Sequence, residues 1–334
     1  MTVTTIDAPV DSTERLARAL RLVRRLLLPI LLVVEFTIFT ALSPYFLTAQ
    51  NLLNIVTNAS DLALIAAGLT LVVLLGGIDV STGFAVGLIS WLAGTMMNSL
   101  APPIFVLIAA IVAGTLLGLL NGTLLAKLSI PSIVATLGTS AIFQTLLFAL
   151  WNSTDVFSGP VFPFLAGQAR VLGVPVLVLI VLAIYLLLHF VLTSTRFGRS
   201  IYAIGSNREA ATLAGINASR VRVACYAILG ALVGLTACTY LGRVGVVQAS
   251  SGSELTLLSI AAVVVGGTSI LGGEGSVIRT LGGLIFIVVL QNGVVLAGVP
   301  PLWNGLMIGL VILLAVSIDG LVVLLNSRKS RNLS

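Results

Sequence analysis

Long apolar runs recur along the chain, and polar residues gather in the short segments between them. A helix that spans a bilayer needs about 20 mostly apolar residues. We identify ten such runs, at residues 26–42, 53–76, 82–99, 104–126, 131–151, 172–193, 221–241, 255–271, 277–297 and 302–325. The runs are continuous rather than alternating, which excludes a transmembrane barrel. The pattern predicts an all-α integral membrane protein with about ten transmembrane helices.

Composition supports a membrane protein independently of the run boundaries. The chain has 334 residues, of which 58% are hydrophobic and only 8% are charged. Soluble domains carry roughly 25% charged residues. A water-soluble fold of this length needs more polar surface than this chain supplies, so lipid is its expected environment.

The basic residues predict the orientation of the runs. Arginines and lysines precede the first run and follow the last, so we expect both termini in the cytoplasm, which requires an even number of spans. The ten-run topology places seven further basic residues in inner loops, namely Lys127, Arg196, Arg199, Arg208, Arg220, Arg222 and Arg279. It leaves Arg170 and Arg243 outside. The net charge of +6 is therefore an orientation signal, and we expect no nucleic-acid partner.

Four regions follow from this topology. Residues 1–25 form a cytoplasmic arm with an amphipathic helix on the inner leaflet, and residues 26–325 form the transmembrane domain. Residues 194–220 are a long cytoplasmic loop within that domain, and residues 326–334 are a cytoplasmic tail. A short echo between residues 75–83 and 241–252, on opposite sides of the membrane, suggests an inverted internal repeat.

The sequence contains no recognisable motif for catalysis, ATP binding or metal binding. The lysines Lys127 and Lys329 follow Ala126 and Arg328, so the G-K-[ST] sequence of an ATP-binding P-loop is missing. One histidine and two cysteines give no obvious metal site. We expect no catalytic residue, cofactor or metal, and if ATP drives the protein, another polypeptide must bind it.

The loop at residues 194–220 contains a candidate docking helix. Asn207 suits an N-cap, Arg208 follows it, and Glu209 suits the first turn. Ala210 and Ala211 are small, and Gly215 suits the end of the helix. Such a helix can press into a groove on a partner, and an ordinary loop helix is the alternative.

Four motifs in order resemble those of bacterial ABC import permeases of the ribose/xylose/arabinose (monosaccharide) family. Glu209-Ala210-Ala211 with Gly215 resembles their EAA-type coupling loop. The other three segments are Gly76-Gly77-Ile78-Asp79-Val80-Ser81 with Gly83, then Asn121-Gly122 with residues 130–139, and Ser253-Glu254-Leu255 with residues 260–275. The related autoinducer-2 import permeases are similar too, and Glu35 and Asp61 are a cue toward them.

The resemblance implies a transport subunit rather than an enzyme. It implies ten spans in the bacterial cytoplasmic (inner) membrane, surrounded by lipid and paired with a second permease chain, identical or similar. It also implies two cytoplasmic ATPase subunits and an extracytoplasmic solute-binding protein. The expected function is import of a monosaccharide or sugar-like solute, with autoinducer-2 as an alternative.

Polar residues inside the runs are candidates for the translocation path. Gly76 and Gly77 interrupt the second run just before Asp79 and Ser81, and broken membrane helices line cavities. An inner-interface carboxylate that caps the third run is the alternative for Asp79. Hydroxyl and amide groups that could contact a sugar, or hydrogen-bond neighbouring helices instead, are Asn121, Thr136, Thr139, Gln144, Gln291 and Asn292.

Two further groups of residues suggest packing roles. Gly266, Gly267, Gly272 and Gly273 predict a tight turn and close helix packing at the inner end of the eighth run. Trp151, Tyr240 and Trp303 lie near the outer ends of runs, where we expect an aromatic belt.

Other functions compete with an ABC permease. An ion-coupled secondary transporter would use ionisable groups within the spans, and Glu35, Asp61 and Asp79 could serve it. A branched-chain amino acid permease would favour countercharges along its path, yet the spans hold almost no basic residues. A membrane enzyme fits least, because no acid–base or nucleophile pair is discernible.

Overall fold

The computed structural model describes residues 28–99, 101–128, 130–151, 156–157, 165, 167–303, 305–307, 309–311, 313 and 317. Its helices are Leu28–Leu42, α2 (Ala49–Leu74), α3 (Thr82–Asn98), α4 (Pro103–Leu128), α5 (Ser132–Trp151), α6 (Val176–Ser194), α7 (Arg196–Ser206), α8 (Arg208–Leu213), α9 (Ala218–Val244), α10 (Ser253–Val265), α11 (Val277–Leu296) and the 3₁₀ turn η1 (Pro301–Trp303). Strand β1 (Val156–Phe157) pairs antiparallel with β4 (Val246–Val247), and β2 (Arg170–Val171) pairs with β3 (Val174–Pro175).

The predicted runs agree with these helices over most of their length. Each of the first nine predicted runs, from the run at 26–42 to the run at 277–297, overlaps one helix. Six helices, α2, α4, α5, α6, α9 and α11, are long and apolar enough to cross a membrane, and Leu28–Leu42 and α10 are shorter. The run at 255–271 is wrong at its end, because the helix stops at Val265, before Gly266 and the left-handed Gly267. Run 302–325 lies largely outside the described residues, and the arm and the tail lie entirely outside them.

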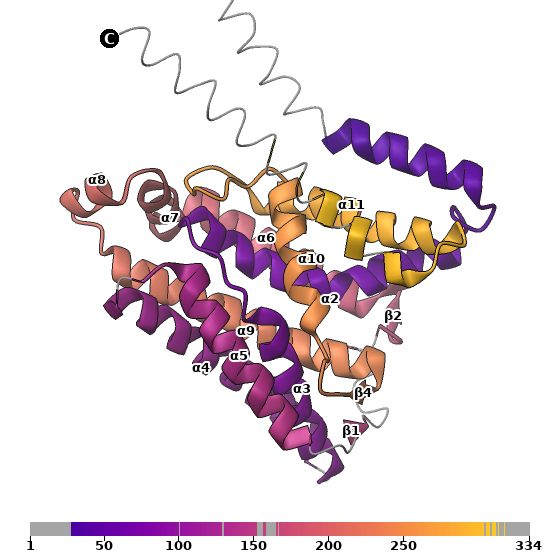
Figure 1. Ribbon diagram of the computed structural model, residues 1–334, viewed down its shortest axis with the longest axis horizontal. Coiled ribbons are helices and arrows are strands. Elements are labelled where there is room, and N and C mark those ends of the chain that lie inside the picture. Colours follow the sequence, from indigo (N-terminus) through magenta and orange to yellow (C-terminus); the bar gives the residue numbers. More distant parts are fainter. Residues whose placement is uncertain are drawn as a thin grey trace, which may run out of the picture.

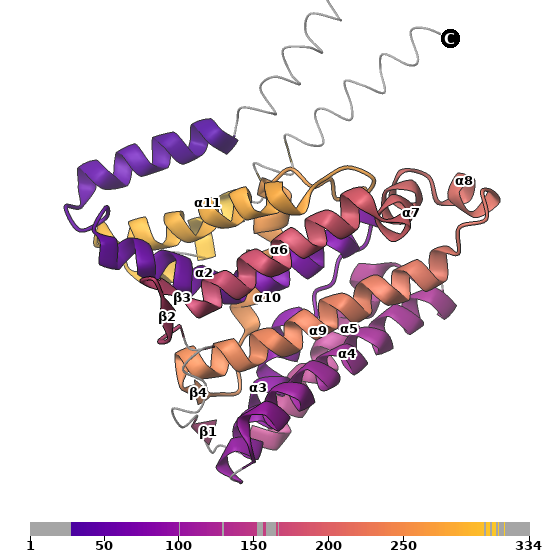
Figure 2. The same ribbon diagram turned by 180° about the vertical axis from the view of Figure 1, so that it is seen from behind.

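The helices form two groups that meet along α2 and α9 (Figure 1 and, from behind, Figure 2). One group holds α3, α4, α5 and α9, and the other holds α2, α6, α10, α11 and the helix Leu28–Leu42. Helix α2 is the centre of the molecule, because residues 59–74 are buried on every side. Its sequence fits that position, since from Leu62 to Leu74 it is uncharged and, apart from Thr70, apolar.

Helices α4 and α9 pack with their backbones in contact. Gly114 and Gly118 are four residues apart on α4, and a Cβ at either would collide with a carbonyl oxygen of Gly230 or Tyr226 on α9. Small residues at this spacing let membrane helices approach closely and gain dispersion contacts that lipid does not replace. The four-residue glycine spacing thus fixes the tightest helix pair of the fold.

Two non-helical segments, one between α2 and α3 and one between α9 and α10, cross each other where the two groups of helices meet. The chain between α2 and α3 has no helical structure over residues 77–80, and the chain between α9 and α10 is non-helical over residues 245–252. A Cβ on Gly83 would collide with the Gly252 carbonyl oxygen, and one on Gly87 would collide with that of Ser251. The two segments that echo each other in the sequence therefore touch backbone to backbone.

The loop at residues 194–220 contains two helices, where the sequence predicted one. Helix α7 is amphipathic and buries Ile201 and Ile204 against the body of the protein. Its Tyr202 hydroxyl donates to the Gly275 carbonyl oxygen at 3.0 Å. The sequence analysis missed α7 because its apolar residues are few and lie among polar ones.

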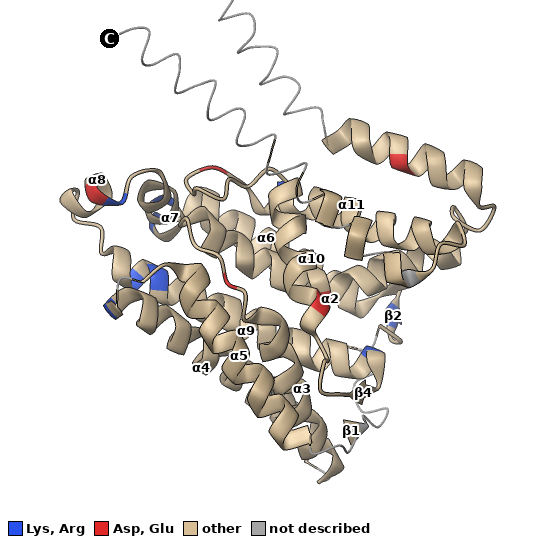
Figure 3. Ribbon diagram, in the orientation of Figure 1, with Lys and Arg blue, Asp and Glu red and all other residues tan. Residues whose placement is uncertain are grey.

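Most of the described basic residues gather toward one end of the molecule (Figure 3). All four strands lie at one end, which we call the β-strand end, and α7 and α8 lie at the opposite one, the α7–α8 end (Figures 1 and 2). The seven loop arginines and lysines assigned to the inside lie toward the α7–α8 end. Arg170 and Arg243 lie at the β-strand end.

Candidate functional site

An open groove of about 600 Å³ lies at the β-strand end, between the end of α5 and the segment before α10. Its described lining residues carry amides, hydroxyls and aromatic rings but no charge, and they are Gln144, Thr145, Phe148, Trp151, Gln248, Ala249 and Ser250. The rings of Phe148 and Trp151 lie 6.2 Å apart. Amides and hydroxyls can hydrogen-bond a sugar hydroxyl, and an aromatic face can cover its apolar C–H surface.

Only Gln144 among the predicted path residues lies in this groove. The sequence analysis missed Gln248 and Ser250, although polar residues directly before a short helix could have indicated them. It assigned Trp151 to an aromatic belt, whereas the structure places Trp151 beside Gln144 in the groove. Tyr240, also assigned to that belt, is 8% exposed, and its hydroxyl accepts a long hydrogen bond from the Gly252 backbone N–H at 3.4 Å.

Asp79 lies in the interrupted segment and is 3% exposed. Its Oδ1 accepts hydrogen bonds from the Ser81 backbone N–H at 2.8 Å and from the Ser81 hydroxyl at 2.6 Å. The Asn121 side-chain amide donates to Asp79 Oδ2 at 3.3 Å and to Ser81 Oγ at 2.8 Å. Asp79 therefore organises the turn into α3, a geometry close to the capping role that the sequence left open.

The space beside Asp79, Ser81 and Asn121 is too small for a solute. It measures about 10 Å³ and is walled by glycines and apolar side chains of α4 and α9. That volume is the lower limit for one water molecule. Asn121 Oδ1 is buried there without a partner among the described residues. In this conformation the Asp79 cluster is closed to a sugar.

The two predicted threonines on α5 bond to backbone. Thr136 Oγ1 accepts from the Val80 N–H at 3.1 Å and donates to the Ser132 carbonyl oxygen at 2.8 Å. Thr139 Oγ1 donates to the Thr136 carbonyl oxygen at 3.3 Å. Both side chains are buried, so in this conformation they serve helix α5 and the interrupted segment.

The predicted amides on α11 lie away from the groove. Asn292 and Asn51 of α2 exchange two side-chain hydrogen bonds of 2.9 Å each. Asn51 also donates to the Phe46 carbonyl oxygen at 2.8 Å. Asn292 thus joins two helices, which is the alternative that the sequence analysis left open. Gln291, its neighbour, is half-buried.

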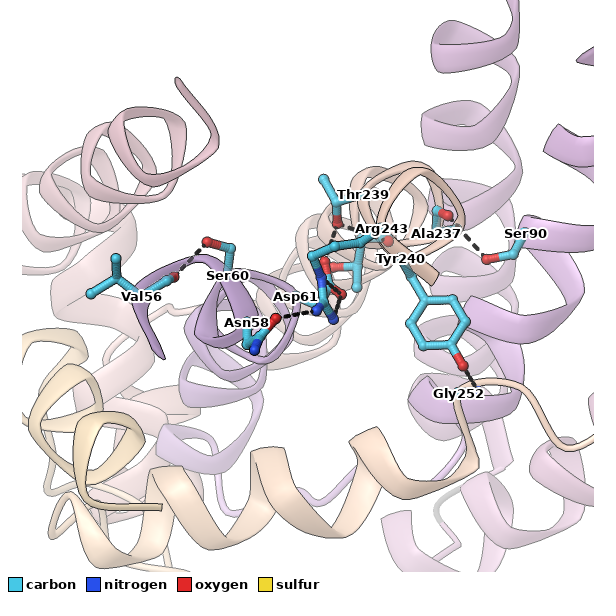
Figure 4. Close-up of polar contacts among 11 residues, drawn as sticks. Val56, Asn58, Ser60, Asp61, Ser90, Ala237, Thr239, Tyr240, Arg243 and Gly252 are labelled. Carbon is cyan, nitrogen blue, oxygen red and sulfur yellow. Dashed lines mark hydrogen bonds and ion pairs between the residues drawn. The ribbon is translucent and has the colours of Figure 1, made fainter. Parts of the chain in front are cut away.

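A buried ion pair joins α2 and α9 near the β-strand end (Figure 4). Arg243 Nε donates to Asp61 Oδ2 at 3.0 Å, and its NH1 donates to Asn58 Oδ1 at 2.6 Å. The Thr239 hydroxyl donates to the other Asp61 oxygen, and the Asp61 side chain is only 1% exposed. Because a carboxylate so buried needs a countercharge, Arg243 is committed to Asp61 rather than free in an outer loop.

Glu35 differs from Asp61. It is 6% exposed on the helix Leu28–Leu42, and neither carboxylate oxygen has a hydrogen-bond partner among the described residues. The three acidic residues that an ion relay could use therefore have separate surroundings, since Asp61 bonds Arg243 and Asp79 bonds Ser81.

Helix α8 has well-formed ends. The Asn207 side chain caps its start by accepting from the Ala210 N–H at 2.9 Å. At its end the Ile216 N–H donates to the Ala211 carbonyl oxygen and the Gly215 N–H to that of Thr212, both at 3.0 Å. This bonding is a Schellman motif, which requires the left-handed Gly215 (φ +84°). Arg208 and Glu209 in its first turn are exposed.

A glycine junction connects α7 to the broken end of α2. A Cβ on Gly205 would collide with the Leu74 carbonyl oxygen, and one on Gly272 would lie 2.7 Å from the Gly76 nitrogen. The Gly273 N–H donates to the Leu74 carbonyl oxygen at 2.9 Å. Gly76, Gly272 and Gly273 all have positive φ. The backbone therefore meets at one place from three elements, namely α7, the turn before α11 and the broken end of α2.

Of the other two glycines of the predicted turn, only Gly266 adjoins α11. A Cβ on Gly266 would lie 2.6 Å from the Arg279 carbonyl oxygen, while Gly267 has a positive φ and open space around it. Gly77, after the break in α2, lies beside the Tyr226 hydroxyl.

Comparison with known proteins shows the family. Residues 51–316 match the family described as "Branched-chain amino acid transport system / permease component". The ribose import permease protein RbsC of Escherichia coli K12 is 35% identical over 295 residues, covering 87% of this chain and 92% of the relative. RbsC of Bacillus subtilis is 36% identical over 284 residues, covering 84% and 88%.

A second group of relatives consists of permeases named for autoinducer 2 import. The autoinducer 2 import system permease protein LsrC of Salmonella typhi is 33% identical over 290 residues, covering 86% of this chain and 83% of the relative. No solved structure matches the chain. With its apolar helices and this similarity over most of its length, the chain is a multi-pass membrane protein and belongs to the transport-system permease family that matches residues 51–316.

Proposed function

We propose that this chain is the transmembrane permease subunit of an ATP-binding cassette importer that moves a monosaccharide or sugar-like solute into the cytoplasm. The groove at the β-strand end carries the proposal, because amides, hydroxyls and aromatic rings line it without any charge among its described residues. The names of the RbsC relatives, which are ribose import permeases, favour the same class of solute.

The energy source lies outside the chain. The sequence has no P-loop, so we propose that two cytoplasmic ATPase subunits hydrolyse ATP and that helix α8 docks on them. A second permease chain, identical or similar, completes the membrane part, and an extracytoplasmic binding protein delivers the solute to the groove. The capped, exposed helix α8 supports this docking role, since its ends are fixed while Glu209 and Ala210 are exposed.

Three alternatives have weaker support. Autoinducer-2 import rests on the LsrC similarity, and of its two residue cues, Glu35 and Asp61, the second is accounted for by the pair with Arg243. Branched-chain amino acid import rests on the family description, yet a zwitterion would favour charged groove residues. An ion-coupled transporter would need linked ionisable groups, whereas Asp61 and Asp79 are held in separate hydrogen-bond networks.

We also propose ten spans with both termini in the cytoplasm. The concentration of basic residues toward the α7–α8 end supports this orientation by the positive-inside rule (Figure 3). Arg243 is paired with the buried Asp61 within the protein. Arg170 is then the one described basic side chain at the β-strand end that has no buried countercharge.

Cysteine labelling tests the orientation. Leu172 in the β2–β3 turn is 99% exposed and Leu213 at the end of α8 is 90% exposed, so a cysteine at either place is accessible. In intact cells a membrane-impermeant maleimide should label Leu172→Cys, and it should label Leu213→Cys only after the membrane is opened. The unmodified chain is the background control, because Cys225 and Cys238 are buried. Labelling of Leu213→Cys in intact cells would refute the orientation.

Reconstituted transport tests the function. Vesicles that contain the permease, its ATPase and loaded binding protein should accumulate the sugar against its gradient when ATP is supplied, and vesicles with the permease alone should not. Gln248→Ala should lower the initial uptake rate by about tenfold, the effect of losing one hydrogen bond to the passing solute.

The matched control is Thr123→Ala, a half-buried threonine on α4 outside the groove whose hydroxyl bonds its own helix, and its uptake should equal that of the unmodified protein. Uphill uptake by the permease alone, driven by a proton or sodium gradient, would contradict the proposal. Equal uptake by Gln248→Ala and the unmodified protein would remove the groove from the path.

The end of α8 tests coupling. Gly215→Val should abolish uptake and the stimulation of ATP hydrolysis by loaded binding protein, because a β-branched residue tolerates the left-handed conformation poorly. Gly215→Asn is the control, since asparagine adopts that conformation, and no other atom lies within 4 Å of a Cβ at this site. Glu209→Lys should weaken coupling as well. If Gly215→Val and Glu209→Lys both keep full stimulation, α8 is not the coupling element.

A further inference from the structure

A second cavity, of about 280 Å³, lies at the α7–α8 end beneath the break in α2. It is lined by the broken end of α2, the start of α5, the first residue of α8 and the first turns of α9. The described residues that line it are Val72, Leu75, Gly76, Gly77, Leu125, Ile130, Pro131, Ser132, Arg208, Arg222 and Tyr226. Nothing in the proposed transport mechanism uses this cavity.

Two like charges face this cavity. Arg208 is exposed on α8, Arg222 is half-buried on α9, and both side chains line the same cavity. Arg222 NH1 donates one hydrogen bond, to the Leu125 carbonyl oxygen at 3.2 Å. Among the described residues, no carboxylate lines the cavity or forms an ion pair with either arginine. Two neighbouring cations without a countercharge attract an anion.

Two hydroxyl groups add hydrogen-bond donors. Tyr226 is 1% exposed, and its hydroxyl lies beside the Ser132 hydroxyl without a well-formed hydrogen bond to it. A Cβ on Gly77 would lie 3.2 Å from that hydroxyl, which places it beside the helix break. Ser132 Oγ accepts from the Ile78 N–H at 3.0 Å, and its proton can turn toward a ligand or toward the neighbouring Tyr226 oxygen. A buried hydroxyl left without a partner is costly, so a ligand that accepts from Tyr226 would be favoured.

We propose that this cavity binds a phosphate group, held by Arg208, Arg222, Tyr226 and Ser132. Guanidinium groups match the oxygens of phosphate in pairs, and a phosphate has enough acceptor positions for both arginines and both hydroxyls. The group could belong to inorganic phosphate, to a small soluble phosphate ester or to a lipid headgroup of the adjoining leaflet, because all three present the same oxygens.

Binding would fix α8 relative to α9. Without an anion the two arginines repel each other, and with one they are joined through it. Since α8 is the proposed coupling helix, the occupied site would regulate how ATP hydrolysis is transmitted, a consequence that rests on the proposed function. The binding itself does not depend on that function.

Calorimetric titration tests the site. The full chain in phosphatidylcholine nanodiscs is titrated with inorganic phosphate at constant ionic strength, and saturable binding is expected. Arg208→Gln and Arg222→Gln should each raise Kd by about tenfold, the loss of one charge-assisted hydrogen bond. Tyr226→Phe should raise it several-fold. Arg208 is exposed, so its variant tests the site even if Arg222→Gln fails to fold.

Arg220→Gln is the matched control, because Arg220 is exposed on the same helix, two residues from Arg222, and does not line the cavity. Its Kd should be unchanged. Absence of saturable binding, or an equal loss in Arg220→Gln, would overturn the proposal. Absence of binding in the complex with the ATPase would also overturn it, since an acidic side chain of that partner would then occupy the arginines.

A second arm distinguishes the sources of the phosphate. Nanodiscs that contain phosphatidic acid present a phosphate monoester at the membrane surface. If they abolish binding of free phosphate to the unmodified protein, the lipid headgroup occupies the site. If binding of free phosphate persists, the site serves a soluble phosphate. Neither outcome involves transport, so failure of this proposal is distinct from failure of the proposed function.

Discussion

Each backbone N–H that a broken helix exposes inside a membrane must find a partner within the protein, and this requirement shapes the centre of the molecule. The segment between α2 and α3 meets it with side chains from two helices and its own turn. Ser132 and Thr136 of α5 accept from the N–H groups of Ile78 and Val80, and Asp79 accepts from that of Ser81. Thr256 of α10 accepts from Gly83 at 2.8 Å. Several polar residues that the sequence suggests for a solute path therefore hydrogen-bond the interrupted backbone instead. The interruption that they stabilise brings α3 and α10 into contact.

Close backbone packing follows from the same interruption. Glycines 83, 87 and 252 let the two broken segments cross, and Gly205, Gly272 and Gly76 connect the break in α2 to α7. Helix α7 leads directly into α8, so the proposed ATPase contact is joined to the centre of the protein by backbone rather than by flexible side chains. A movement of α8 would act on the helix break through this junction. At the other end, the buried pair of Asp61 and Arg243 holds α2 against α9, and the uncharged groove opens beside it.

The sequence predicts the helices better than it predicts the site. Apolar runs locate each helix because burial in lipid requires long uncharged segments, and Asn207 and Gly215 mark α8 because capping is local chemistry. Arg243 was assigned to an outer loop, since nothing local shows that Asp61, 182 positions away, lies within hydrogen-bond reach. Thr136 and Asn292 could equally have contacted solute or neighbouring helices, and only the fold decides between those roles. The groove and the phosphate cavity were not predicted, because each combines residues from segments far apart in the chain.

The central claim is that side chains of neighbouring helices satisfy the interrupted backbone, and one stability comparison on α5 tests it directly. Thr136→Val and Thr145→Val remove the same hydroxyl from the same helix, and each hydroxyl bonds the carbonyl oxygen four residues earlier. Only Thr136 also accepts from a backbone N–H of the interruption, that of Val80. The thermal unfolding midpoint of the purified protein should fall clearly in Thr136→Val, in line with a loss of about 1–3 kcal/mol for a buried unpaired N–H, and should stay unchanged in Thr145→Val. Equal midpoints for the two variants would contradict the account.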